Sequence, residues 1–357
     1  MSGIWGNKIK ISIFGESHGE AIGAIIEGLP SGIKLNLEAI RFQMRRRAPG
    51  KSDLGTGRTE EDEFEILSGY FNEFTTGTPL AFIIRNNDKR SSEYEYIKDI
   101  PRPSHGDYTG RIKYKGYNDY RGGGHFSGRL TASIVFAGSV CRQILEDKGI
   151  VITSHIKSIG KIDDDAFDFN YIDKDLISRL NNMELPLLDK EKVNMMKEEI
   201  LSAKADDDSV GGSIECALLG LPAGIGDPYF ESVESKLSHI LFSIPGVKGI
   251  EFGSGFHITR LKGSQANDEL YLDNGEVKTR TNHNGGIAGG ITTGMPVIFR
   301  VAIKPTSSIG ITQNSVDIGK MEEVEFNITG RHDPCIVPRA VPVVEAAASI
   351  AILDFML

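Results

Sequence analysis

Cysteine is scarce in this sequence, and its positions exclude a disulfide framework. Only Cys141, Cys216 and Cys335 occur among the 357 residues, far apart and without a C-x-x-C pair. Their number is odd, and no secretory signal peptide opens the chain. A secreted scaffold held by disulfides is therefore excluded, and we expect a protein of the reducing cytoplasm.

Long hydrophobic runs and an excess of positive charge are also lacking. The longest apolar stretches, 130–141 and 340–357, are too short for a membrane span or carry Glu345 and Asp354. Lysine and arginine number 40 against 49 aspartate and glutamate residues, which gives a formal net charge of −9. We therefore expect no membrane segment and no general nucleic-acid binding, although a local basic pocket is compatible with this balance.

Several common catalytic and nucleotide-binding motifs are absent or incomplete. No H-x-x-x-H or H-E-x-x-H spacing indicates zinc, so we expect no metal site. Residues 15–19 match G-x-S-x-G, but only fourteen residues precede them, whereas several strands precede the nucleophile of a serine hydrolase. Residues 50–52 lack the first glycine of a P-loop, and Ser127 interrupts the G-x-G-x-x-G spacing of a Rossmann enzyme. All four classes are disfavoured.

Glycine, by contrast, is abundant, at 41 of the 357 residues against a typical share of about 7%. Two clusters, 122–128 and 285–294, predict backbone that adopts positive φ or approaches another group closely. The first cluster runs into an apolar helix, where free N–H groups and the helix dipole favour an anion. Ser127 and Arg129 add donors suited to phosphate or carboxylate. The alternative interpretation is tight turns alone.

Other polar segments allow a functional and a structural interpretation. Residues 304–308 combine an ammonium with three hydroxyls and suit a second phosphate. Residues 45–47, three arginines, form either a solvated helix end or part of an anion pocket. Arg331 and Asp333 either pair with each other or bind an anion and move a proton. Five histidines lie in such segments: His18, His105, His125, His283 and His332.

These features together predict proton-coupled chemistry on a polyanionic small molecule with an organic cofactor. The remaining histidines, His155, His239 and His257, lie in ordinary strand or helix surroundings and are predicted to be structural or exposed.

Hydrophobic periodicity predicts an α+β protein with antiparallel sheets. Strands are expected at 8–14, 21–28, 80–85 and 296–303, and helices at 37–47 (capped by Asn36), 130–147, 190–204, 231–242 and 340–355.

The two halves of the chain also share short segments in the same order. Gly-Leu-Pro-Ser-Gly-Ile at 28–33 returns as Gly-Leu-Pro-Ala-Gly-Ile at 220–225, and Thr-Thr-Gly-Thr-Pro at 75–79 returns as Thr-Thr-Gly-Met-Pro at 292–296. The repetition predicts a duplicated sheet-plus-helix unit packed as one domain, 1–357, with halves of about 1–150 and 205–357.

Motifs along essentially the whole chain resemble those of the chorismate synthase family. They are Phe-Gly-Glu-Ser-His-Gly at 14–19, Arg-Arg-Arg at 45–47, Arg-Pro-Ser-His-Gly-Asp-Tyr-Thr at 102–109, Asp-Tyr-Arg-Gly-Gly-Gly at 119–124, Ser-Gly-Arg at 127–129, His-Asn-Gly-Gly at 283–286, Lys-Pro-Thr-Ser-Ser at 304–308, Gly-Arg-His-Asp-Pro-Cys at 330–335 and Arg-Ala-Val-Pro at 339–342. The chain departs from many members at Leu130 and Ile134 (glutamate and arginine), His125-Phe126 (Arg-Ser) and Pro245-Gly246 (Asn-Ala).

The resemblance implies a lyase that forms chorismate, the last step of the shikimate pathway to the aromatic amino acids. The implied reaction is a trans-1,4 elimination of phosphate from 5-enolpyruvylshikimate 3-phosphate, with reduced FMN required. It also implies a homotetramer whose subunit is a β-α-β sandwich, which agrees with an internal pseudo-two-fold repeat. Two alternatives are a noncatalytic flavin- or phosphate-binding regulator and a flavin-dependent oxidoreductase.

The matched motifs also imply roles for single residues. His18 would protonate the departing phosphate, His105 would pair with the reduced flavin, and Asp333 would assist proton transfer. Substrate contacts are implied for Arg47, Arg121, Arg129 and Arg339. FMN contacts are implied for His125, Phe126, Ser127, Gly289, Lys304, Pro305, Thr306, Ser307, Ser308 and Arg331.

The source of the reduced flavin is left open by the resemblance, which associates the chain with FMN, FAD and NADP. Arg46 stands at a position associated with the nicotinamide phosphate. Asp53, however, stands where other members have a second such arginine. NADPH is therefore expected only as an external or weakly bound reductant, and a separate flavin reductase is a possible partner.

Overall fold

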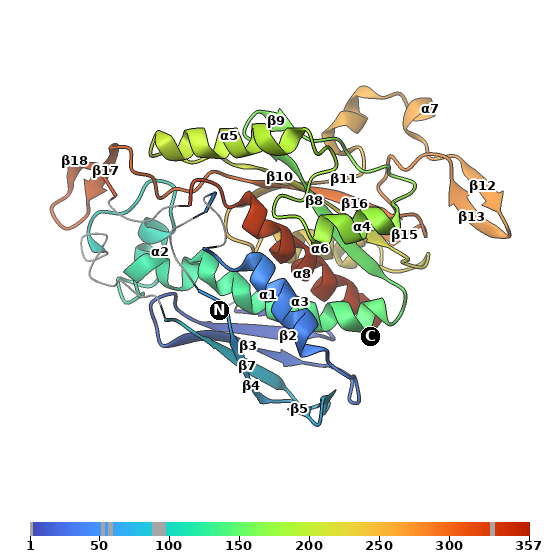
Figure 1. Cartoon of the computed structure of the whole chain (residues 1–357), viewed down its shortest axis with the longest axis horizontal. Helices are drawn as coiled ribbons and strands as arrows, with labels where there is room; N and C mark the ends of the chain where they lie inside the picture. The colour runs from blue at the N-terminus through green and yellow to red at the C-terminus, as the bar shows by residue number, and fades with distance from the viewer. Residues whose placement is uncertain (1–2, 51–53, 56–59, 88–97, 329–332) are drawn as a thin grey trace.

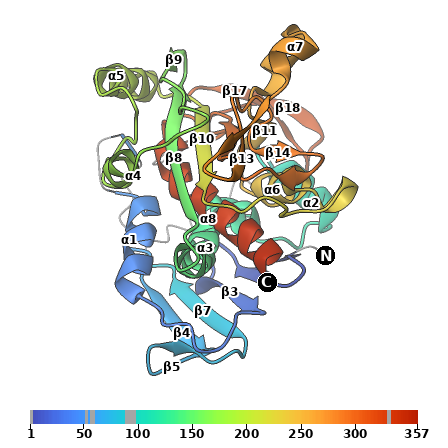
Figure 2. The ribbon, with the colours of Figure 1, turned by 90° about the vertical axis from the view of Figure 1, so that its right-hand side faces the viewer.

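Two five-stranded antiparallel sheets enclose a layer of helices. The computed structural model describes residues 3–50, 54–55, 60–87, 98–328 and 333–357. Helices α3 (Thr131–Glu146) and α8 (Val337–Met356) lie between the sheets, as Figures 1 and 2 show. The α+β class and the sandwich of sheet, helices and sheet are therefore confirmed.

The first sheet comes from the N-terminal part of the chain. In spatial order its strands are β1 (Ile4–Trp5), β2 (Lys10–Gly15), β3 (Ala21–Glu27), β7 (Leu80–Arg85) and β4 (Phe64–Ser68). Alternate side chains of β3, including Ile22, Ala24 and Ile26, are buried against the helices, as period-two alternation requires. The three strands predicted in this region are confirmed.

The second sheet has the order β11 (Val247–Phe252), β16 (Val297–Ile303), β10 (Gly212–Leu219), β8 (Val151–Ile159) and β9 (Ile162–Asp163). Strand β16 confirms the prediction at 296–303. Strands β8 and β10 were not among those predicted, because buried polar residues such as His155 and Glu215 interrupt their apolar pattern.

The predicted helices are all present, with ends shifted by a few residues. The helices are α1 (Leu37–Arg47), α2 (Asp107–Lys113), α3, α4 (Lys174–Asn181), α5 (Lys192–Ala205), α6 (Val233–Leu241), α7 (Gly263–Ala266) and α8, and short 3₁₀ turns span Arg121–Phe126, Gly128–Leu130, Tyr229–Glu231 and Gly255–Arg260. The Asn36 side chain accepts a hydrogen bond from the Ala39 amide and caps α1 as predicted. Helix α8 begins three residues before its prediction because Pro338 is tolerated in a first turn, which needs no N–H donor there.

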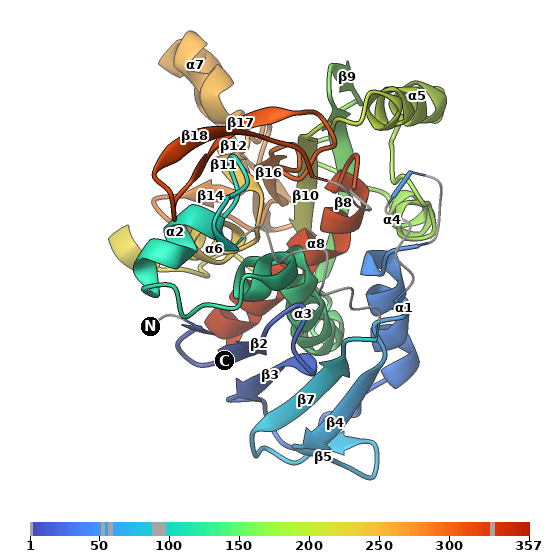
Figure 3. The same cartoon turned by 90° about the vertical axis from the view of Figure 1, so that its left-hand side faces the viewer.

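Small hairpins project from the sandwich. They are β5 (Tyr70–Phe71) with β6 (Phe74–Thr75), β12 (Leu270–Asp273) with β13 (Glu276–Thr279), β14 (Ile287–Ala288) with β15 (Ile291–Thr292), and β17 (Gln313–Asp317) with β18 (Glu322–Phe326). The last hairpin, β17–β18, lies beside α2 (Figure 3). The Ile318 amide in its turn donates a hydrogen bond to the carbonyl of Asp99, which precedes α2 in the chain. It therefore helps to hold the segment that leads into α2.

The two sheets share one connectivity. When the shorter hairpins, 3₁₀ turns, strands β1 and β9, and helices α2, α4, α5 and α7 are set aside, the order strand, strand, helix, strand, strand, helix describes β2-β3-α1-β4-β7-α3 and again β8-β10-α6-β11-β16-α8. The corresponding strands also occupy corresponding places, β2-β3-β7-β4 and β8-β10-β16-β11. The first strand of the second set, β8, begins at Val151, which is earlier than residue 205, where the second half was predicted to begin. The pseudo-two-fold relation between the halves, and their union in a single domain, stay predictions.

The three cysteines are buried and free, in keeping with the expected absence of a disulfide framework. Burial raises the pKa of the Cys141 and Cys335 thiols to about 12, so neither is reactive near neutral pH. Among the helices in the described ranges, none is both long enough and apolar enough to cross a bilayer.

A buried carboxylate near the end of α8 ties it to the start of β2. Asp354 accepts hydrogen bonds from the backbone amides of Asn7, Lys8 and Ile9 at 3.1, 2.6 and 2.7 Å. Lys236 of α6 pairs with the same carboxylate at 2.5 Å. One side chain therefore joins three segments that are distant in sequence.

We expect Asp354→Asn to lower the free energy of unfolding by about 1.5–3 kcal/mol, because hydrogen bonds to a charged group are the strong ones. Urea unfolding measures the difference. Asp273→Asn, on an exposed hairpin where the carboxylate pairs with Lys278, is the control and should change the free energy by under about 1 kcal/mol. Equal losses in the two variants would contradict the assigned role of Asp354.

His155 is buried between two carboxylates on the second sheet. Its Nδ1 lies 3.1 Å from Asp164 and its Nε2 lies 3.0 Å from Glu215, so both ring nitrogens donate. Burial alone would lower the pKa of His155, but the hydrogen bonds to Asp164 and Glu215 outweigh burial and raise it. Arg300, 3.9 Å from Glu215, and Lys157, which donates to the Asp164 carbonyl, also face this group.

The raised pKa predicts stability that depends on pH. The contribution is fully present below the unfolded pKa of His155, near 6.5, and is lost as the pH rises through the higher folded value. We expect urea unfolding to show wild type losing stability relative to His155→Gln as the pH rises above about 6.5. A difference between the two proteins that does not vary with pH would contradict this assignment.

Candidate active site

A cavity of about 630 Å³ lies at the N-terminal ends of α3 and α8, which both begin on the side of the molecule that carries α2 (Figure 1). Thirteen of the predicted site residues line it: Arg47, His105, His125, Phe126, Ser127, Arg129, Lys304, Pro305, Thr306, Ser307, Ser308, Asp333 and Arg339. Segments far apart in the sequence therefore meet at one site, and both halves of the chain contribute.

The cavity wall is strongly basic although the whole chain is acidic. Among the described residues that line it, six are basic and two are acidic. The basic residues are Arg47, Arg102, Arg129, Lys248, Lys304 and Arg339, and the acidic ones are Glu60 and Asp333. This excess of positive charge suits an anionic ligand and confirms that the net charge of −9 is compatible with a local basic pocket.

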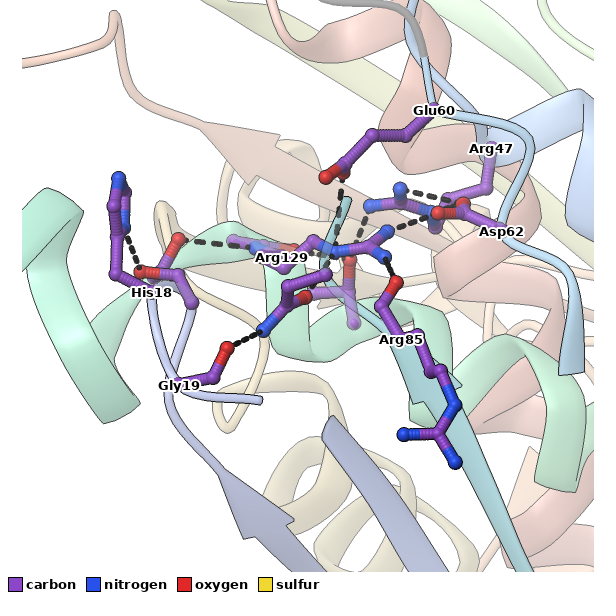
Figure 4. A network of polar contacts seen from close by, with 12 residues as sticks. His18, Gly19, Arg47, Glu60, Asp62, Arg85 and Arg129 are labelled. Atoms are coloured by element: carbon purple, nitrogen blue, oxygen red, sulfur yellow. Dashed lines mark hydrogen bonds and ion pairs between the residues drawn. The ribbon is translucent and has the colours of Figure 1, made fainter. Parts of the chain in front are cut away.

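Two of the arginines share one buried carboxylate, as Figure 4 shows. Arg47 Nε and Nη2 lie 2.7 and 2.6 Å from Asp62 Oδ2, while Arg129 Nη1 contacts Asp62 Oδ1. Arg129 Nε is also 3.2 Å from Glu60. Arg339 Nε donates to the Arg47 carbonyl at 3.1 Å. The guanidinium groups are thus positioned before any ligand arrives, which lowers the entropic cost of binding.

Burial and neighbouring charges act on the pKa values of this cluster. Burial first, and then the charges of Arg339 and Arg129, lower the pKa of Arg47 to about 10 against the opposing effect of Asp62. Burial would raise the pKa of Asp62, but Arg47 and Arg129 outweigh it and keep the pKa below its usual value. Arg47 and Asp62 are therefore both charged at neutral pH, and an added anion would relieve the repulsion of Arg47 by its neighbouring arginines.

The glycine run passes between the two histidines that the sequence predicts to be catalytic. Gly122, Gly123 and Gly124 all have positive φ, of 63°, 114° and 53°. A Cβ on Gly122 would lie 2.0 Å from the His18 ring, and one on Gly123 would lie 3.2 Å from the His105 ring. A side chain at Gly122 is therefore excluded. The predicted close approach of glycine backbone to another group is confirmed at these positions.

His105 is held by the ion pair of Asp107 and Arg102, and Arg102 in turn contacts the 304–308 loop. Its Nδ1 lies 2.7 Å from Asp107, which also binds Arg102 Nε and Nη2 at 2.7 and 2.8 Å. Burial would raise the pKa of Asp107, but its hydrogen bonds with Arg102 and His105 prevail and lower it. An ionised carboxylate only accepts, so the 2.7 Å contact with Asp107 favours a proton on His105 Nδ1 over the longer contact of that atom with Arg102 Nη2 at 3.1 Å. Arg102 also donates to Ser308 at 3.1 Å.

The 304–308 loop is anchored from both sides. Lys304 donates to the Ser104 carbonyl at 2.6 Å, and Thr306 donates to the Asp333 carbonyl at 2.7 Å. Asp333 pairs in turn with Arg339 at 2.7 Å. Burial, and then the charge of Lys248, lower the pKa of Lys304. An anion beside Lys304 would stabilise its charged form.

Four predicted site residues in the described ranges lie away from the cavity wall. His18 is buried behind Gly122, with its Nδ1 3.2 Å from the Ser17 hydroxyl. Arg121 is half exposed and pairs with Asp119 at 2.8 Å. Arg46 pairs with buried Glu345 at 2.5 Å. Gly289 is in the turn between β14 and β15. Arg331 lies outside the described residues.

Residues that the sequence did not single out complete the site. Asp62 and Asn86 contact Arg129, and Arg102 and Asp107 contact His105. Arg102 and Asp107 stand in the motif at 102–109, so their proximity to His105 offered a signal. Asp62 lies in an acidic stretch and Asn86 follows a strand, and neither position offered a signal in the sequence that pointed to the site.

Leu130 and Ile134, two of the departures from the resemblance, are both buried in the hydrophobic core. Pro245 and Gly246 line the cavity beside Lys304. The departures at 130 and 134 therefore add apolar packing at the start of α3, while those at 245 and 246 alter the cavity wall itself.

Comparison with known proteins agrees with this geometry. Residues 9–357 match the sequence model of the family described as chorismate synthase. Proteins named chorismate synthase from Thermococcus kodakarensis and Pyrococcus abyssi are 46% and 47% identical to this chain, over 99% of it and 97% of each relative. A crystal structure of chorismate synthase superposes with a TM-score of 0.78 at 30% identity, covering 99% of this chain and 93% of that one. The chain belongs to the chorismate synthase family.

Proposed function

We propose that this protein forms chorismate by a trans-1,4 elimination of phosphate from 5-enolpyruvylshikimate 3-phosphate. The elimination breaks one C–O and one C–H bond, forms a C=C bond and releases phosphate and a proton, so it is redox-neutral overall. The observation that carries the proposal is that His105 and a cluster of arginines line one basic cavity. The His18 ring packs directly behind Gly122 of the same wall. Membership of the family gives the reaction class.

The arginines fit the charges of the proposed substrate, which carries one phosphate and two carboxylates. Arg47, Arg129 and Arg339 are held near one another with their guanidinium groups oriented by Asp62 and Asp333. Arginine binds both carboxylate and phosphate through paired N–H donors. These residues would bind and orient the substrate, and Arg121 stays a further prediction because it lies outside the cavity wall.

Another part of the cavity wall fits reduced FMN. This part is apolar, with Ile244, Pro245, Val247 and Ile336. The loop 304–308 beside it offers an ammonium and hydroxyls for the flavin phosphate. Reduced FMN, when bound, would supply an electron-rich ring able to accept a proton from the substrate. We assign its binding to this wall and to His125, Phe126 and Ser127.

The side chains would move protons as follows. The resemblance gives His18 the role of protonating the departing phosphate, since a general acid beside a leaving group stabilises the charge that develops on it. The His18 ring packs behind Gly122 of the cavity wall, so this role requires the phosphate to be bound against Gly122. The hydrogen bond to Asp107 keeps the ring proton of His105 on Nδ1, so His105 would present Nε2 to the reduced flavin. Asp333, held by Arg339, would assist proton transfer. The buried position of His18 would keep bulk water from its proton.

An anaerobic assay tests the proposal. The folded protein with reduced FMN and enolpyruvylshikimate phosphate should yield chorismate and phosphate in equal amounts, with no net oxidation of the flavin. No product from flavin-loaded protein would refute the proposal and favour a flavin-binding regulator. Net NADPH consumption without elimination would favour an oxidoreductase. A need for an added reductase would show that this chain does not reduce its own flavin.

We also propose that the protein works in the cytoplasm as a homotetramer. Leu270, Leu272 and Val277 are exposed on the β12–β13 hairpin, which projects from the sandwich in Figure 1 and supports an interface between subunits. Sedimentation should therefore give four times the mass of one chain. A monomer at micromolar concentration would contradict the tetramer.

A further inference from the structure

Asn86, the residue after β7, joins the segment that carries His18 to the arginine cluster of the site. It is 4% exposed. Its Nδ2 donates to the backbone carbonyls of Glu16 and Gly19 at 2.9 and 3.1 Å, and its Oδ1 accepts from Arg129 Nε at 3.1 Å. In Figure 4, dashed contacts lead from Gly19, next to His18, to Arg129 and the arginine cluster.

The amide orientation of Asn86 is determined by its partners. Two carbonyl oxygens can only accept, and a guanidinium N–H can only donate. The –NH₂ group must therefore face the loop and the oxygen must face Arg129. Among the natural side chains of this size, only an asparagine satisfies all three partners at once, because aspartate has no donor and leucine has neither donor nor acceptor.

The two carbonyls bracket the short segment that carries Ser17 and His18. The Glu16 carbonyl also accepts from the Gly19 amide at 3.0 Å, which closes the turn. The Ser17 amide donates to the Gly124 carbonyl at 3.1 Å, and Gly122 covers the His18 ring. The position of His18 thus depends on the glycine run on one side and on Asn86 on the other.

We propose that Asn86 is a positioning residue, which sets the His18 segment in a fixed relation to Arg129. This inference rests on the proposed function, in which Arg129 binds the substrate and His18 protonates its leaving group. Proton transfer requires the donor within hydrogen-bond reach of the acceptor, and a displacement of about 1 Å can cost a factor near 100 in rate. Asn86 acts through His18 and does not touch the substrate.

Asn86→Asp is the sharpest variant, because it keeps the shape and the contact with Arg129 but places an oxygen against the two loop carbonyls. We expect kcat to fall about 10- to 100-fold with a smaller change in KM. In a His18→Ala background the same substitution should change kcat by less than about twofold, because the group that it positions is gone. An equal loss in both backgrounds would overturn the proposal.

A matched control exists at Asn282, which is also 4% exposed. Its Nδ2 donates to the carbonyls of Phe169 and Pro296 at 2.8 and 2.9 Å, away from the cavity, and its Oδ1 accepts from the Gly286 amide. Asn282→Asp should lower the melting temperature to a similar extent but leave kcat within about twofold of wild type. A fall in kcat equal to that of Asn86→Asp would contradict a positioning role.

Hydrogen–deuterium exchange separates this inference from the proposed function. Exchange of the amides of residues 16–20 should rise at least about tenfold in Asn86→Asp and stay unchanged in Asn282→Asp, whether or not the protein makes chorismate. Unchanged exchange in Asn86→Asp would overturn the inference alone, and absence of chorismate from wild type would overturn the proposed function alone. If Asn86→Asp does not fold, Asn86→Ala, which removes the loop contacts without adding charge, takes its place.

Discussion

Replacing His18 with alanine should lower the rate of chorismate formation about a hundredfold or more. A positioned general acid contributes a factor of roughly 10²–10⁴ to rate. The His18 ring is only 3% exposed and packs directly against Gly122, so neither water nor another side chain can readily replace it. Single-turnover measurement with reduced FMN bound follows the elimination step itself, without the steps of binding and product release.

His105→Ala should cause a loss of similar size, since its ring is held at the cavity by Asp107. His239→Ala is the control: this histidine lies on α6 near Trp5, outside the cavity wall, and its removal should leave the rate within about twofold. A rate close to that of wild type in His18→Ala or in His105→Ala would remove that residue from the proposed mechanism.

Asp62→Ala should destabilise the protein by about 3–5 kcal/mol. Removing one partner of a buried ion pair leaves the other charge uncompensated in a region of low dielectric. Asp62 has two such partners, Arg47 and Arg129, and Arg47 is buried as deeply as Asp62 itself. Urea unfolding at pH 7 measures the loss. Glu63→Ala, whose exposed carboxylate lies 3.6 Å from Arg41, should cost less than about 1 kcal/mol.

The Asp62 carboxylate also makes the free energy of unfolding depend on pH in the acid range. The pKa of Asp62 is lower in the folded protein than in the unfolded chain. Its contribution is therefore fully present above the unfolded value, near 3.9, and is lost as the pH falls through the lower folded value. The free-energy difference between wild type and Asp62→Ala should shrink below pH 4. A difference that does not change between pH 7 and pH 3 would show that Asp62 is not a charged partner of the arginines.

Local pattern was sufficient to predict the apolar elements of the fold. The helix at 37–47 and its Asn36 cap, and the strands at 21–28 and 80–85, follow from periodicity and capping within a few residues. Strands β8 and β10 did not follow, because His155 and Glu215 are buried in them as charged partners of groups from other segments. Such pairing is a tertiary interaction and leaves no periodic signal.

The residues of the candidate site, like the elements of the fold, could be predicted from the sequence only in part. Segments with donors for anions, among them 121–129 and 304–308, were identifiable because residue type alone limits what they can bind. Asp62 and Asn86 were not, because their importance depends on Arg129, which lies dozens of residues away in the chain. Arg46, associated by its motif with nicotinamide phosphate, pairs with Glu345 once the helices pack.

By itself, then, the sequence determined the class of fold, the family and the chemical character of the loops, since these depend on residue type and near-neighbour spacing. The tertiary structure decided which basic residues share a cavity, which tautomer Asp107 imposes on His105, and which amide links the His18 segment to Arg129. These relations depend on distances between segments remote in the chain, and such distances arise only when the two sheets close over α3 and α8 (Figure 2).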